Sequence, residues 1–271
     1  MASVAVVGNL ARDVVNGRAP TPGGCPFFAA EALRRLCLDG QIVTRYAEHD
    51  ADLFAPALAQ LEVRVDLLPA ETTSGFSLDY SGEEREMGVT SIGEVWHPSD
   101  AGTLDGDVEW VHVAPLLRSD FPPPTLAAFA DGRRLSLDGQ GLVRVPTVGR
   151  LAVDAAFDPE LLRNVTALKL SEEEARIVAD GAFDSAAAAR LRVPEVLLTL
   201  GSHGCVVFTG GAETFVPAAW PVLDVQTTGA GDAFMVAYAA ARTDGAEAFE
   251  AARRASRLVA ETLEERKASA G

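Results

Sequence analysis

The stretch TTGAGDAF at residues 227–234 carries the most specific pattern in the chain. Its small residues allow the backbone to turn sharply and to expose several N–H groups where a helix begins. Those N–H groups and the positive end of the helix macrodipole can hold an anion such as a phosphate. The stretch therefore predicts an anion hole at the start of a helix, although an ordinary Gly-rich turn before a helix has the same composition.

Asp232 falls in the first turn of this predicted helix, directly after the small residues. A carboxylate beside a bound anion can act as general base for a substrate hydroxyl that attacks a phosphoryl group. Asp is also favoured at helix starts for capping alone. Both explanations fit the position.

Outward from this motif, strand and helix patterns alternate along the chain. The β-branched run SVAVVG at residues 3–8 is typical of a buried strand. A polar loop and the Pro/Gly-rich residues 20–24 follow it. The later strands are expected at 41–47, 109–114, 135–138, 167–170 and 196–200, and the helices at 27–38, 50–61, 124–130, 172–179, 230–242 and 246–266. This alternation predicts an α/β fold with a mostly parallel central sheet flanked by helices.

Residues 71–96 break the rhythm. Polar and apolar residues alternate over 73–80, SGEE at 81–84 resembles a turn, and alternation resumes to about Trp96. Such a pattern indicates a small antiparallel insertion with one solvated face. We therefore expect a single domain over residues 1–271, interrupted by this insertion.

The bulk composition limits the classes of partner. The 271 residues are 48% hydrophobic and 23% charged, which is typical of a globular protein, and the formal net charge is −16. This acidity argues against a nucleic-acid partner, because duplex binding relies on Lys and Arg. It does not argue against a nucleotide, whose phosphates can be held by backbone N–H groups and Mg²⁺.

The cysteines and the N-terminus bear on the compartment. Cys25, Cys37 and Cys205 are few, odd in number and without CxxC spacing, so neither a disulfide framework nor a zinc site is expected. The first residues run into an apolar strand without a basic leader segment. No apolar run approaches the roughly 20 residues that span a bilayer. These features favour the cytoplasm and no association with a membrane.

The motif TTGAGDAF, followed by an Ala-rich helix, resembles the signature of the ribokinase-like (PfkB) carbohydrate kinases. The resemblance implies that Asp232 is the catalytic base, that Gly229, Ala230 and Gly231 form the anion hole, and that Thr228 belongs to the ATP site. It also implies ATP and Mg²⁺ as cofactors, and a small β lid, which residues 71–96 would supply. Gln226 departs from the Asp that is usual in the family.

Two segments near the N-terminus match the family's substrate side. The residues PGGC at 22–25 resemble its double-glycine motif, so Gly23 and Gly24 are expected to close over a sugar. Asp13 matches the Asp after the first strand that binds substrate hydroxyls. A loop before a helix start and an ordinary loop acid are the alternative explanations.

On the donor side, KLSEEE at 169–174 resembles the family's Asn-x-x-Glu element, which organises Mg²⁺ and phosphates. The resemblance implies that Lys169 and Ser171 belong to the ATP site and that Glu174 acts on the metal through water. Ser171 stands where the family has Asn. A Ser N-cap followed by acids in the first turn explains the segment equally well.

The residues TLGSHG at 199–204 resemble a strand-to-turn element beside ATP. Thr199, Gly201 and Gly204 are therefore expected in the ATP site. A simple hairpin turn would have the same pattern.

The residues SLDGQGLVR at 136–144 resemble a segment in a branch of short family members that includes the plant-type myo-inositol kinases. Gln140 and Arg144 follow the carboxyl end of a predicted strand, where open α/β sheets bind ligands. They are expected to contact substrate, as is Phe28, which replaces the family's usual Asn. A solvated loop is the alternative.

The sequence thus predicts an ATP-dependent kinase acting on a hydroxyl of a small sugar or polyol, with a cyclitol such as myo-inositol included. Motifs for P-loop enzymes, dinucleotide-binding dehydrogenases, zinc proteases and Gly-x-Ser-x-Gly hydrolases are absent from the sequence. A nucleoside kinase of the same fold and a catalytically weak sugar- or nucleotide-binding protein remain alternatives. A homodimer is compatible with all of these.

Overall fold

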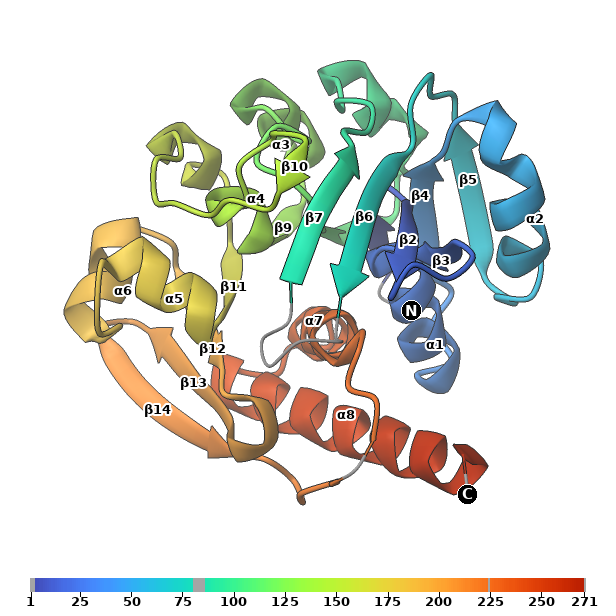
Figure 1. The fold of residues 1–271 in the computed structure, drawn as a ribbon. Helices are drawn as coiled ribbons and strands as arrows, with labels where there is room; N and C mark the ends of the chain where they lie inside the picture. The colour runs from blue at the N-terminus through green and yellow to red at the C-terminus, as the bar shows by residue number, and fades with distance from the viewer. Residues whose placement is uncertain (1–2, 80–85, 224, 271) are drawn as a thin grey trace.

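The computed structural model describes residues 3–79, 86–223 and 225–270. The predicted turn at 81–84 lies outside the described residues. The described chain forms a large sheet covered by helices, and a smaller sheet lies in front of the middle of it in Figure 1.

The large sheet is mostly parallel, as predicted. Its nine strands within the described residues have the order β14-β13-β12-β11-β9-β8-β1-β4-β5. All neighbouring pairs from β12 to β5 are parallel, whereas β12, β13 and β14 pair antiparallel. The strands span Ser3–Val7 (β1), Gln41–Arg45 (β4), Arg64–Leu68 (β5), Val108–Val113 (β8), Arg134–Asp138 (β9), Ala167–Ser171 (β11), Glu195–Thr199 (β12), Gly204–Thr209 (β13) and Ala212–Pro217 (β14).

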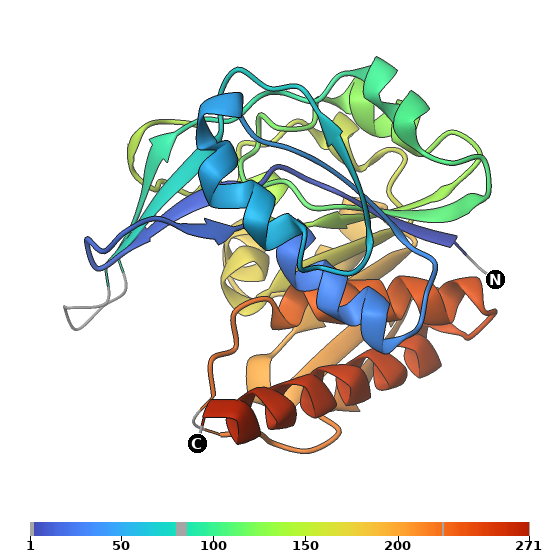
Figure 2. The same ribbon diagram turned by 90° about the vertical axis from the view of Figure 1, so that its right-hand side faces the viewer.

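Helices cover both faces of this sheet (Figure 2). The long helices α7 and α8 lie with α1 on one face, and the shorter α3, α4, α5 and α6 lie on the other. The helices span Cys25–Arg35 (α1), Ala51–Leu58 (α2), Pro123–Phe129 (α3), Gln140–Val143 (α4), Glu172–Ala179 (α5), Ser185–Leu191 (α6), Ala230–Thr243 (α7) and Ala248–Ala270 (α8); 3₁₀ turns span Glu48–Asp50 (η1), Pro98–Thr103 (η2), Pro159–Leu162 (η3) and Gly201–His203 (η4).

The central strand β1 is a continuous apolar run because both of its faces are buried. In β1, Val4 and Val6 enter the core beneath α7 and α8, whereas Ala5 and Val7 enter the core on the opposite face. A parallel sheet covered by helices on both sides requires such continuous apolar runs. The SVAVVG run is therefore explained by its place in the centre of the sheet.

The smaller sheet is assembled from distant segments. Its order is β10-β7-β6-β2-β3 among the described residues, with β2 Ala11–Val15, β3 Thr21–Gly23, β6 Ser74–Asp79, β7 Glu86–Ser91 and β10 Gly149–Arg150. The antiparallel pair β6–β7 lies inside the predicted insertion. However, β2, β3 and β10 come from elsewhere, and β2 pairs with β6 in parallel. Residues 11–15 and 21–23 were expected to be loop, and that expectation is wrong, because such short, partly exposed strands carry little periodicity.

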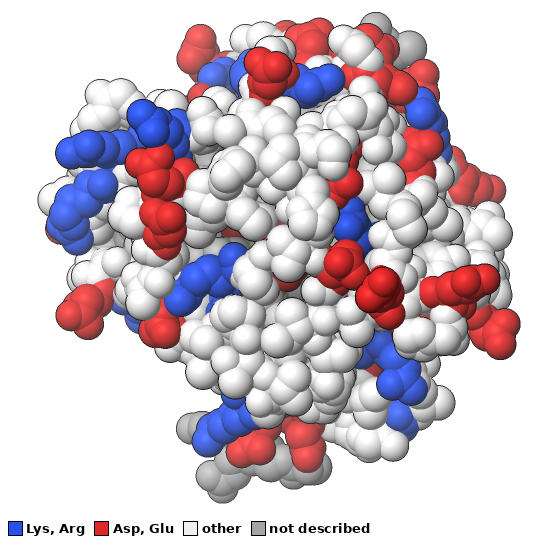
Figure 3. Space-filling view, turned by 90° about the horizontal axis from the view of Figure 1, so that it is seen from above, with Lys and Arg blue, Asp and Glu red and all other residues white. Residues whose placement is uncertain are grey.

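Charged groups are dispersed over the surface seen in Figure 3, where Lys and Arg alternate with Asp and Glu between wide uncharged areas. On this face the acidic side chains therefore stand in small groups. Over the part of the chain that the structure describes, none of the helices combines the length and apolar character needed to cross a bilayer.

Candidate active site

The predicted anion loop precedes α7, which begins at Ala230. Gly229 has a φ of 80°, in the left-handed region, and a Cβ atom there would lie 2.2 Å from Cγ of Phe28. Only glycine meets both conditions. The first-turn N–H groups of Gly231 and Asp232 have no acceptor within the helix, as in any helix start. The local sequence therefore produces the turn and the exposed donors that an anion requires.

A larger cavity of about 800 Å³ lies on one side of this loop, and Thr228, Gly229 and Asp232 help to line it. A smaller cavity of about 260 Å³ lies beside Ala230 and Gly231. Thr227 lines both cavities. The loop thus stands between two spaces, and Asp232 faces the larger one.

The larger cavity gathers most of the predicted substrate residues. Asp13, Gly24, Phe28, Gln140 and Arg144 all line it, although they come from β2, α1 and the region of α4. Its wall is completed by residues of the small sheet, namely Phe76 and Leu78 of β6 and Met87 of β7.

Gly23 is not part of the cavity wall, but it makes room for Asp13. A Cβ atom at Gly23 would lie 2.0 Å from Oδ2 of Asp13. The absence of a side chain at position 23 therefore allows the Asp13 carboxylate to take its place in the wall.

The smaller cavity is lined by part of the predicted donor-side segment TLGSHG. Thr199, Gly201 and Gly204 line it. Trp220, Val222, Val259 and Leu263 give it an apolar wall. Thr228, which was expected in the ATP site, lines the larger cavity instead.

Three residues of the predicted donor segment line neither cavity, namely Lys169, Ser171 and Glu174. Ser171 and Glu174 form a capping box at the start of α5: Glu174 N–H donates to Ser171 Oγ (3.3 Å) and Ser171 N–H donates to Glu174 Oε2 (2.8 Å). The capping explanation for this segment therefore holds in the structure.

Lys169 lies beneath the anion loop. Its Nζ donates to Asp138 Oδ2 at 3.0 Å, and a Cβ atom at Gly231 would lie 3.3 Å from the same Nζ. Burial alone would lower the pKa of Lys169, but Asp138 and Glu174 raise it above its ordinary value. The ammonium group stays charged and presents a positive charge to the underside of the loop.

The carboxylates around Lys169 differ in their pKa. Burial, and then repulsion from Asp138, raises the pKa of Asp232 to about 6, with Lys169, a Cys25 hydrogen bond and Arg144 acting in the opposite direction. Burial likewise raises the pKa of Glu174. For Asp138 burial is opposed by Lys169 and His112, and its pKa is lowered. Asp232 is therefore ionised at neutral pH, yet remains a better proton acceptor than an ordinary aspartate.

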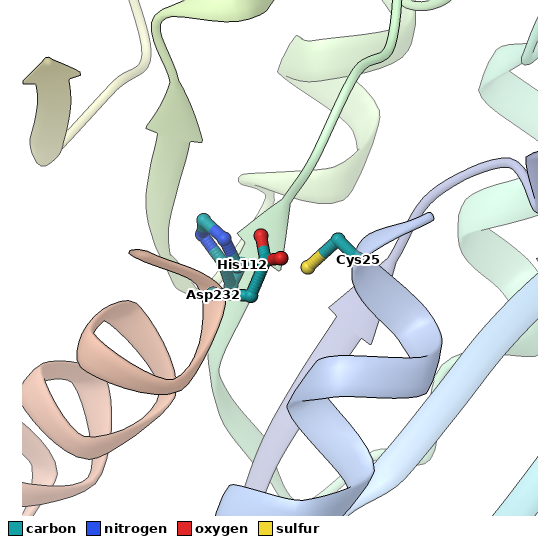
Figure 4. A group of neighbouring side chains, drawn as sticks. All are labelled: Cys25, His112 and Asp232. Atoms are coloured by element: carbon teal, nitrogen blue, oxygen red, sulfur yellow. The ribbon is translucent and has the colours of Figure 1, made fainter. Parts of the chain in front are cut away.

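Asp138, His112 and Cys25 were not predicted as site residues. Asp138 ends β9 and His112 lies near the end of β8, whereas Cys25 opens α1. Burial, and then the charge of Asp232, raises the pKa of the Cys25 thiol well above its ordinary value. The side chains of Cys25, His112 and Asp232 form one group, whose ligand atoms lie within 4.8 Å of one another (Figure 4). The carboxyl-end rule for parallel sheets could have pointed to Asp138 and His112.

Comparisons with known proteins point to one family. The model of the pfkB family of carbohydrate kinases matches residues 106–271. A fructokinase from Klebsiella pneumoniae is 30% identical over 234 residues, which cover 79% of this chain and 74% of that enzyme. An inositol 3-kinase from Zea mays is 33% identical over 124 residues, 44% of this chain and 31% of that enzyme.

A solved structure of a pyrophosphate-dependent kinase of the ribokinase family, complexed with a pyrophosphate analog and myo-inositol, has the same fold. It superimposes with a TM-score of 0.82 at 22% identity, covering 96% of this chain and 95% of that one.

Proposed function

Because the chain belongs to the pfkB family of carbohydrate kinases and is therefore a phosphotransferase, we propose that it moves the γ-phosphoryl group of ATP to a hydroxyl of a small sugar or polyol, with cyclitols among the candidates. One observation carries the proposal. Asp232 faces the larger cavity, while the two residues before it, Ala230 and Gly231, line the smaller one. The general base and the anion hole thus lie between the two cavities, where the acceptor hydroxyl would approach the donor phosphate.

In this mechanism Asp232 accepts the proton of the acceptor hydroxyl as its oxygen attacks the γ-phosphorus. The bond from that phosphorus to the bridging oxygen breaks, and ADP leaves. A pKa of about 6 suits the base, because it is ionised at neutral pH and still basic enough to take the proton. The N–H groups at the start of α7, with Lys169 beneath them, stabilise the negative charge on the transferred group.

The larger cavity suits a compact polyhydroxylated ring. Asp13, Gln140 and Arg144 offer hydrogen-bonding groups, and the Arg144 guanidinium lies 6.0 Å from the ring centre of Phe76. Phe28 and Phe76 provide apolar walls that can pack on the C–H face of a sugar or cyclitol. The strands β6 and β7 over this cavity act as the lid that excludes water.

The smaller cavity suits the base of a nucleotide. Trp220 and Leu263 give it flat and apolar surface, and the buried Nε1 of Trp220 has no hydrogen-bond partner within the described residues. An adenine ring can pack against this apolar surface. A bare pyrophosphate would not use it.

Mg²⁺ fits the donor set around the loop. Asp138 and Glu174 bring two carboxylates into the electrostatic neighbourhood of Lys169, and Mg²⁺ prefers such oxygen ligands. When bound, Mg²⁺ would neutralise charge on the donor phosphates. Glu174 would hold it through water, because one of its oxygens already accepts the Ser171 N–H.

The test is a product-release screen with pentoses, hexoses, inositols and nucleosides, run with Mg·ATP and, in parallel, with Mg·pyrophosphate. We expect ADP release, highest for one sugar or cyclitol. A nucleoside with the highest kcat/KM would support the nucleoside kinase instead. Turnover from pyrophosphate alone would reject ATP as donor. Ligand binding without turnover from either donor would support the weak binding protein.

A further inference from the structure

The group of Cys25, His112 and Asp232 contains two side chains that phosphoryl transfer does not require. A carboxylate base needs neither a thiol nor an imidazole beside it, yet both lie within 4.8 Å of Asp232. In Figure 4 the Cys25 sulfur is turned toward the Asp232 carboxylate, and the His112 ring lies on the other side of it. The three side chains come from α1, β8 and α7, so the fold brings them together.

The imidazole of His112 is oriented so that its Nε2 atom can bind a metal ion. Its Nδ1 lies 3.0 Å from Ser136 Oγ, which also accepts the Trp110 indole N–H. Its Nε2 is fully buried and has no hydrogen-bond partner among the described residues. A proton on Nδ1, donated to Ser136, leaves the Nε2 lone pair available. Metal-binding histidines are typically oriented in this way through their second nitrogen.

The ligand set selects the metal. Thiolate, imidazole and carboxylate are the donors that Zn²⁺ prefers, whereas Mg²⁺ prefers oxygen alone. A Zn²⁺ ion with the thiolate of Cys25 and the carboxylate of Asp232 would form a neutral group. A neutral metal group suits this position, because the nearby charges of Asp138, Lys169 and Arg144 already compensate one another in part.

We propose that Cys25 Sγ, His112 Nε2 and the Asp232 carboxylate form a binding site for Zn²⁺ in the wall of the larger cavity, separate from the Mg²⁺ that accompanies the donor. Cys25 and Asp232 line the cavity, so the ion can enter from it. Binding replaces the thiol proton, which is released to solvent. A water molecule in the cavity supplies the fourth ligand of a tetrahedral ion.

On the basis of the proposed function, in which Asp232 is the general base, this site predicts that Zn²⁺ inhibits the kinase. Zn²⁺ would occupy the base that the acceptor hydroxyl needs, and its open position faces the acceptor. Zn²⁺ should therefore inhibit in competition with the acceptor and not with Mg·ATP.

The decisive experiment measures binding without any substrate. Zn²⁺ affinity is determined by competition with a chromophoric chelator, and Co²⁺ serves as a spectroscopic probe of thiolate coordination. The variants are Cys25→Ser and His112→Gln. The matched controls are Cys205→Ser, the same change at a second buried thiol, and His203→Gln. Thermal unfolding verifies that each variant is folded.

We expect one Zn²⁺ per chain, a thiolate-to-Co²⁺ charge-transfer band, and affinity reduced at least about tenfold in both variants, because even an outer-shell change costs about 10- to 100-fold. The controls should bind like the wild type, and excess Mg²⁺ should not displace Zn²⁺. Wild-type affinity in Cys25→Ser, or no charge-transfer band in the wild type, would overturn the proposal.

The inhibition experiment is separate from this one. An unaltered acceptor KM in the presence of bound Zn²⁺ would remove the inhibitory role. A chain without kinase activity that still binds Zn²⁺ would reject the proposed function and keep the site.

Discussion

The ammonium group of Lys169 lies 3.0 Å from the carboxylate of Asp138, and both side chains are buried beneath the anion loop. Removing one partner of a buried ion pair leaves an uncompensated charge and costs about 3–5 kcal/mol. We therefore expect Lys169→Met to lower the free energy of unfolding by about that amount, as measured by urea denaturation. The double variant Lys169→Met/Asp138→Asn should recover part of the loss. A single variant as stable as the wild type would contradict the pairing.

Asp232→Asn tests the general base. The amide cannot accept the acceptor proton, so kcat should fall about 10²–10⁴-fold. ATP affinity and the thermal unfolding midpoint should be retained, because the side-chain shape is unchanged. Asp244→Asn, at the exposed opposite end of α7, is the matched control and should keep wild-type activity. A kcat near that of the wild type in Asp232→Asn would remove this residue from the mechanism.

The pKa of Asp232 near 6 sets the direction of the pH dependence. The base works only when ionised, so kcat/KM should fall as pH drops through about 6 and level off above it. The donor phosphates also bind protons near this range. The residual activity of Asp232→Asn separates the two causes. If Asp232 is responsible, the fall of kcat/KM at acidic pH should disappear in this variant. If protonation of the donor phosphates is responsible, the fall should persist.

The parts of the fold that the sequence could predict are those determined by local residues. The anion loop and α7 follow from TTGAGDAF, and β1 follows from its β-branched run. The strands β13 and β14 were missed, although Gly210 and Gly211, both with positive φ, mark the hairpin between them. The sequence of β14 shows little alternation of apolar and polar residues. The reason is that β14 is an edge strand of the large sheet, and all of its residues except Val216 are exposed.

The small sheet and the group around Asp232 could not be derived in the same way. β3 is only three residues long and contains Pro22 at the sheet edge, where proline is tolerated. His112 and Asp138 come near Asp232 only because β8 and β9 are neighbours in the sheet beside α7. Such proximity depends on strand order, which spacing along the sequence does not encode. The same reason explains why CxxC spacing gave no indication of a metal site.

Gly229→Ala tests the shape of the anion loop. A non-glycine residue at a φ of 80° costs about 1–2 kcal/mol, and the new Cβ would overlap Phe28. We expect a lower unfolding midpoint and a loss of kcat, because the loop must shift. Adding Phe28→Ala should relieve the overlap but not the backbone strain, so the midpoint should recover only in part. An unperturbed Gly229→Ala protein would mean that the loop tolerates a side chain.

The separation of the cavities predicts that acceptor and donor binding can be altered independently. Asp13 lines only the larger cavity and Trp220 only the smaller one. Asp13→Asn removes a charged hydrogen-bond acceptor, worth about 1.5–3 kcal/mol, and should raise the acceptor KM roughly tenfold or more while leaving the ATP KM unchanged. Trp220→Ala removes apolar surface beside the adenine base and should raise the ATP KM alone.

The measurement is steady-state kinetics with each substrate varied in turn. If Asp13→Asn raised the ATP KM, or Trp220→Ala the acceptor KM, by as much as its own, the assignment of the two cavities would be wrong. Thr227, which lines both, supplies the internal comparison, because Thr227→Val should affect both constants.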